Sequence, residues 1–116
     1  MRKTAQDYHR ERRGNCAQSV AYAWNSKNPG AQNSEERFSE CGGGQAPGGL
    51  CGALHVSCVL AGHADAASMK RKFAEKSGGH LTCREIRAAG LLTCYACVGL
   101  AAELLDEHVQ KIKKCD

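Results

Sequence analysis

The residues of this 116-residue chain that are best suited to chemistry are its eight cysteines, at positions 16, 41, 51, 58, 83, 94, 97 and 115. A thiolate is both a nucleophile and a ligand for iron or zinc, so a set of this size indicates metal binding or redox work. The first fifteen residues contain no apolar run typical of a secretory signal, and we expect a cytoplasmic protein. Reducing conditions there disfavour permanent disulfides, which leaves the thiols available for ligation or exchange.

Cys51 stands among glycines in the stretch GGLCGALHVSC, at the start of an apolar helical pattern. Glycine lets the backbone turn and approach another group closely, as a sulfur that meets a metal, a cluster or another sulfur requires. His55 follows four residues later on the same helical face, at a spacing that suits two ligands of one metal. A lone histidine is more often packed or hydrogen-bonded, so His55 is the less favoured ligand.

Cys94 and Cys97 form a CxxC pair that fits none of the common motifs. A thioredoxin-like motif follows a strand, and no strand pattern precedes Thr93. Attachment of c-type haem requires a histidine after the second cysteine, where this chain has Val98. A zinc ribbon requires a second CxxC pair, which the chain lacks. Both thiols therefore remain candidates for a metal or redox site.

The elements that must position these thiols are predicted to be helices. Only 5% of the residues are aromatic, and the apolar 42% is rich in small and aliphatic side chains, which favours helix packing over a sheet. We predict an all-α fold: one domain spanning residues 1–116, a small bundle of about five helices with a glycine-rich loop at 42–49. Helical spacing and capping signals place helices at about 4–26, 50–62, 66–76, from 83 onward and 94–114, with a short one near 33–41.

Several cysteines are predicted to cluster at helix starts. Thr82 and Glu85 fit a capping box that makes Cys83 the first helical residue, and Thr93 is placed to cap a helix that begins at Cys94. Amide donors and partial positive charge at a helix amino end stabilise a thiolate. Cys16, in contrast, is expected on the apolar face of the first helix.

The remaining cysteines have simpler interpretations. Cys58 is expected to fill the core, because free cysteine behaves as a small apolar side chain. Cys115 is expected to be a surface thiol near the chain end, and Cys41 either a core residue at a helix end or a cover over a site.

Four separated segments together resemble one known family. These are Asn15-Cys16-Ala17-Gln18-Ser19-Val20, the glycine-rich loop leading into Cys51-Gly52-Ala53, Thr82-Cys83-Arg84-Glu85-Ile86, and Cys97 followed by Val98-Gly99-Leu100. The chain resembles the C-GCAxxG-C-C family of redox-active proteins over nearly its whole length, although Val56 stands where the family has a glycine. The resemblance implies a small helical redox protein, related to a domain of the split-Soret cytochromes. It implies cofactor and metal ligation by Cys16, Cys51, Cys83 and Cys97, and it favours a [2Fe-2S] cluster.

The expected function is electron transfer by an iron-sulfur cluster held by four dispersed cysteines, in an electron carrier rather than an enzyme acting on a small molecule. The alternatives are a metal-free thiol-disulfide redox protein and a structural or sensory zinc site. Cys94 is the alternative to Cys97 as fourth ligand.

A redox partner protein is the expected partner, and the net charge of +4 suits steering of an acidic one. No aromatic residues interleave the basic runs, so nucleic-acid binding is not expected. The apolar segment 50–67 is interrupted by His55, His63 and Asp65, so no membrane span is expected. A homodimer in which two chains share one site is left as an alternative.

Overall fold

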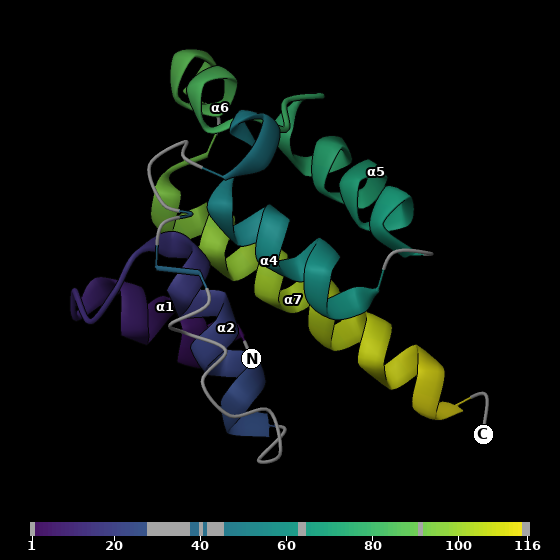
Figure 1. Ribbon diagram of the computed structural model, residues 1–116. Helices are drawn as coiled ribbons and strands as arrows, with labels where there is room; N and C mark the ends of the chain where they lie inside the picture. Colours follow the sequence, from purple (N-terminus) through teal and green to yellow (C-terminus); the bar gives the residue numbers. More distant parts are fainter. Residues whose placement is uncertain are drawn as a thin grey trace.

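Helices make up nearly all of the structure, a computed structural model that describes residues 2–27, 38–39, 41, 46–62, 65–90 and 92–114 (Figure 1). The elements in chain order are α1 (Arg2–Arg10), α2 (Cys16–Lys27), the 3-10 turn η1 (Pro47–Gly49), α4 (Gly52–Ala61), α5 (Ala66–Ser77), α6 (Cys83–Ala89) and α7 (Cys94–Lys114). Within those described ranges, the extended pairing is limited to one isolated antiparallel bridge between Leu50 and Thr82. The predicted all-α class is confirmed.

The long helix α7 is the element around which the others pack. Helices α1, α2, α4 and α5 all contact it, and α4 runs beside it through the middle of the molecule (Figure 1). Its inward face includes four buried residues: Cys97, Ala101, Leu104 and Leu105. No helix in the described part of the chain is long and apolar enough to cross a membrane.

The single helix predicted at about 4–26 is wrong, because α1 ends at Arg10 and α2 begins at Cys16. Arg12 adopts a left-handed conformation with φ of 58° in the connection. Asn15 then caps α2 reciprocally with Gln18. The Gln18 amide donates to Asn15 Oδ1 at 2.7 Å, and the Asn15 amide donates to Gln18 Oε1 at 3.0 Å. Cys16 is therefore the first residue of a helix rather than an internal one.

Replacing Asn15 by alanine is expected to destabilise the fold by about 1 to 2 kcal/mol, the upper part of the range for loss of an N-cap. The Asn15 amide group also donates to the Phe38 and Ser39 carbonyls, so more than the cap is lost. Urea unfolding measures the change. Ser26→Ala, an exposed polar change on the same helix, is the control and should stay within about 0.5 kcal/mol. Equal effects of the two changes would contradict the capping role.

The predicted starts of the later helices agree closely with the structure. Cys51 is the N-cap of α4, and the Thr82 hydroxyl accepts a hydrogen bond from the Glu85 amide at 3.2 Å, so that α6 begins at Cys83. The Thr93 hydroxyl accepts from the Ala96 amide at 3.1 Å at the start of α7. The short helix predicted near 33–41 lies mostly outside the described residues, as do residues 42–45 of the predicted loop.

Helix α6 lies at the edge of the bundle (Figure 1). Ile86 is its one buried residue, and the side chains of Arg84, Glu85 and Arg87 are exposed. Among the described α-helices, it packs least against the others. The segment before it is attached by the Leu50–Thr82 bridge and by the Cys51 amide, which donates to the Leu81 carbonyl at 2.9 Å.

Candidate functional site

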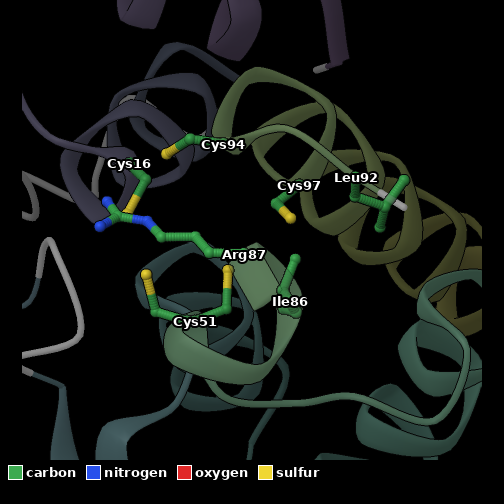
Figure 2. A pocket seen from close by; sticks show the side chains of 8 residues that line it. Cys16, Cys51, Ile86, Arg87, Leu92, Cys94 and Cys97 are labelled. Atoms are coloured by element: carbon green, nitrogen blue, oxygen red, sulfur yellow. The ribbon is translucent and has the colours of Figure 1, made fainter. Parts of the chain in front are cut away.

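Five cysteines line one cavity of about 30 Å³ near the start of α7 (Figure 2). The cavity walls also include Ile86, Arg87 and Leu92. The five thiols come from four helices that are far apart in the chain: Cys16, Cys51, Cys83, Cys94 and Cys97. The tertiary fold thus concentrates sulfur at one point, and local sequence spacing accounts only for the neighbours Cys94 and Cys97.

Every thiol of the cavity stands at the amino end of its helix. Cys16, Cys83 and Cys94 are the first residues of α2, α6 and α7, Cys51 is the N-cap of α4, and Cys97 lies one turn into α7. Amide N–H groups without a helical partner and the positive end of the helix dipole gather there. Four helix amino ends around one cavity favour negative charge on the sulfurs, as thiolates or as ligands of a metal centre.

The thiols of Cys51 and Cys97 are hydrogen-bonded to each other, and this bond shifts their two pKa values in opposite directions. This bond lowers the pKa of Cys97 from the ordinary thiol value, against the opposing effect of burial. The same bond, followed by burial, raises the pKa of Cys51 strongly. Cys97 is therefore the sulfur of this pair that ionises first, with Cys51 as its hydrogen-bond donor.

A second pair joins Cys94 to Cys16. The hydrogen bond to Cys16, followed by burial, raises the pKa of Cys94 strongly, as expected for the donor of such a pair. The charges of Cys51 and Cys83 contribute to the same upward shift. The cavity therefore contains two thiol pairs, with Cys83 as a fifth sulfur close enough to interact with them.

Gly52 lets the amino ends of α2 and α4 approach each other beside the cavity. A Cβ atom at this position would lie 2.4 Å from the Cys41 carbonyl oxygen and 2.9 Å from Cys16 Sγ. Both distances are far shorter than van der Waals contact. The glycine next to Cys51 is therefore required for close approach, which is the role that the sequence suggested for it.

Arg87 is a lining residue that sequence reasoning missed. It follows Cys83 by one helical turn on α6, and in Figure 2 its side chain extends over the cavity, with its guanidinium on the side of Cys16. It is the one cationic side chain among the described residues that line the cavity. The spacing of four residues after Cys83 was the available signal, because i and i+4 share a helix face.

The structure brings all four cysteines of the predicted ligand set together, and it brings Cys94 with them. His55, Cys41 and Cys58 do not line the cavity. The His55 ring instead packs edge-on against Phe38, with ring centroids 6.1 Å apart. Cys58 is buried in the core as predicted, with its sulfur 3.7 Å from the Ala66 carbonyl oxygen. Cys115 lies outside the described residues.

The pKa of His55 tests whether this side chain is packed away from the thiol cavity, as described above. Burial, and then repulsion from Lys70, lowers its pKa from the ordinary 6.5. We expect an NMR titration midpoint below 6.5 that rises in Lys70→Gln and is unchanged in Lys76→Gln. Since the folded protein disfavours the imidazolium, His55 reduces stability as the pH falls from 6.5 toward its lower folded-state pKa. A midpoint at or above 6.5 would contradict the packing described here.

The thiols that line the cavity are donors that suit iron or zinc. Within the described residues, no three His, Cys, Asp or Glu side chains are arranged to hold one metal ion. Five thiols line the cavity, and a [2Fe-2S] cluster takes four thiolates, two on each iron. The number and kind of the sulfurs are therefore those that such a cofactor requires.

Comparisons of the chain with protein-family models, with curated proteins and with solved structures give no match. The chemistry of the cavity is therefore the basis for proposing a function for this protein.

Proposed function

We propose that this protein is a small redox protein that binds an iron-sulfur cluster and exchanges electrons with a partner protein. The observation that supports this most directly is the convergence of five thiols, from four helix amino ends, on one cavity. The resemblance to the C-GCAxxG-C-C family points to the same chemistry. When bound, such a cluster accepts and releases single electrons.

The proposed ligands are Cys16, Cys51, Cys83 and Cys97, with Cys94 as a fifth thiol beside Cys16. Helix-start amides favour the thiolate form of these ligands, and the family resemblance favours [2Fe-2S]. Ile86 and Leu92 limit the access of water from one side of the cavity, while Arg87 offsets negative charge on the sulfurs. These contributions favour the ionised form of the sulfurs once a cluster takes the place of the thiol protons, because the thiol–thiol hydrogen bonds that raise the pKa of Cys51 and Cys94 are then lost.

A reducing cytoplasm is the proposed location, and an acidic redox protein is the proposed partner. The two hydrogen-bonded thiol pairs, which an oxidising compartment would tend to join, support this location. The net charge of +4 favours encounter with an acidic surface.

Thiol-disulfide exchange is the second candidate function, and the Cys51–Cys97 contact favours it. The Cys97 thiolate would attack a substrate disulfide, and Cys51 would then resolve the mixed disulfide. The substrate disulfide becomes two thiols, while Cys51 and Cys97 lose two protons and two electrons as they join. A structural zinc site is less well supported, because structural zinc sites more often take their ligands in closely spaced pairs than from four dispersed segments.

The test is purification without oxygen, followed by visible absorption spectroscopy and analysis of iron, zinc and acid-labile sulfide. We expect broad visible absorption with iron and sulfide in equal amounts. Zinc in a colourless protein would instead establish the structural site. A colourless, metal-free protein whose Cys51 and Cys97 join on mild oxidation would establish thiol exchange.

A further inference from the structure

The thiol cavity contains one sulfur more than the proposed cluster requires. Five cysteines line it, and a [2Fe-2S] cluster takes four thiolates. The proposed ligand set leaves out Cys94, which is therefore available for another role. The thiol of Cys94 is hydrogen-bonded to Cys16, one of the proposed ligands. A role for the fifth sulfur must therefore begin from this contact.

Cys16 and Cys94 meet where two helices begin. They are the first residues of α2 and α7, and Figure 2 shows their side chains next to each other at one side of the cavity. Two sulfurs in hydrogen-bond contact need only a short movement to form an S–S bond, which is about 2 Å long. The first residues of a helix are held by fewer helical hydrogen bonds than internal ones, so this movement meets little resistance.

Solvent reaches this pair more easily than the other thiol pair of the cavity. Cys94 is exposed, whereas Cys51 and Cys97 are only 5% and 2% exposed. Oxidation of a cysteine requires that the oxidant reach its sulfur. An oxidant that arrives from solvent therefore meets Cys94 before it meets the sulfurs of the buried pair.

The volume of the cavity limits the oxidant that fits. One water molecule needs about 10 to 15 Å³ of such space, so a cavity of about 30 Å³ admits a molecule the size of hydrogen peroxide. One sulfur of the pair breaks the O–O bond, becomes a sulfenic acid and releases water. The other thiol displaces the hydroxyl group as a second water and forms the S–S bond. The pair thus gives two electrons and two protons to the peroxide.

We propose that Cys16 and Cys94 form a reversible disulfide in the metal-free protein when hydrogen peroxide enters the cavity. The bond withdraws Cys16 from the ligand set, so that only three of the four proposed ligands remain. The cluster then cannot assemble until two cellular thiols reduce the disulfide and are themselves joined. This effect on the cluster rests on the proposed function, whereas formation of the disulfide does not.

The test uses the full-length protein, freed of bound metal by a chelator and treated with hydrogen peroxide in equal amount. The remaining thiols are blocked, and tryptic peptides are identified by mass spectrometry. Trypsin places Cys16 alone in peptide 14–27 and leaves Cys94 with Cys97 in peptide 88–111. We expect these two peptides to be joined and to separate on reduction. The joined protein should take up at least about tenfold less iron than the reduced protein, the scale expected for loss of a ligand.

Cys94→Ser identifies the sulfur that joins Cys16. In this variant the two peptides should stay separate, and peroxide should no longer lower the uptake of iron. Cys41→Ser is the matched control, because Cys41 is a partly exposed cysteine that does not line the cavity. It should form the link between the two peptides as fully as the parent protein does.

Three outcomes would overturn the proposal: peptides that stay separate in the parent protein, a link that persists in Cys94→Ser, or, in a protein that binds iron, uptake that the link does not lower. Iron analysis of the untreated protein separates this proposal from the cluster. A protein that forms the link but never binds iron would refute only the cluster. A coloured protein whose peptides stay separate after metal removal and peroxide would refute only the disulfide.

Discussion

Cys51→Ser is expected to abolish iron binding, whereas Cys58→Ser is expected to retain it in full. Both cysteines are buried at one helix, Cys51 as its N-cap and Cys58 within it, but only Cys51 lines the thiol cavity. Loss of residues that merely support metal ligands weakens binding by about 10- to 100-fold, so loss of a ligand should cost at least as much. Iron and sulfide per chain, together with visible absorption, measure the result.

The pair is well matched, because serine at position 58 can donate to the Ala66 carbonyl that the Cys58 thiol already approaches. Circular dichroism identifies any variant that fails to fold. Full iron in Cys51→Ser, or its loss in a folded Cys58→Ser, would refute the proposed ligand set. The same measurement on Cys94→Ser and Cys97→Ser decides the fourth ligand, and we expect the larger loss for Cys97→Ser.

Gly52→Ala is expected to destabilise the protein by about 1 to 3 kcal/mol, the usual range for overpacking a core. The added methyl group would overlap the Cys41 carbonyl oxygen, which is backbone and cannot rotate away, and it would press on the Cys16 sulfur. We therefore expect reduced stability in urea and, in addition, reduced iron content, because the amino ends of α2 and α4 are forced apart.

Gly99→Ala is the control for this change. It is also a buried helical glycine, but a methyl group there would meet the flexible side chains of Gln6 and Arg2 instead of backbone. Those side chains can move, and alanine favours the helix, so the change should stay within about 1 kcal/mol of the parent protein. Equal destabilisation by the two substitutions would show that overlap with the Cys41 carbonyl is not the cause of the lost stability in Gly52→Ala.

The helix starts that carry the cysteines were largely predictable from local chemistry. Thr82 and Thr93 are caps whose hydrogen bonds form within one turn, so three or four residues of sequence contain the whole interaction. The break before Cys16 was missed, although Asn15 and Gln18 have the same capping-box spacing. Apolar residues continue at helical spacing through Tyr8, Cys16 and Val20, and this periodicity masked the cap.

The cavity itself was not predictable from the spacing of the cysteines. Cys16, Cys51 and Cys83 belong to helices more than 30 residues apart in the chain, and no local interaction determines where such segments meet. The family resemblance grouped them with Cys97, but it left out Cys94 and Arg87, which line the same cavity. Cys94 and Arg87 line the cavity because of the directions in which α7 and α6 begin, and tertiary packing determines those directions.

The weak attachment of α6 has a consequence for how the sulfurs are reached. Because α6 has one buried side chain, we expect its free energy of local unfolding to be small and its opening to be more frequent than that of the rest of the bundle. Cys83 would move with it, and each such opening would uncover the cavity while α4 and α7 stay folded. We therefore expect reagents and metal ions to reach the sulfurs through local unfolding of this short helix, without global unfolding.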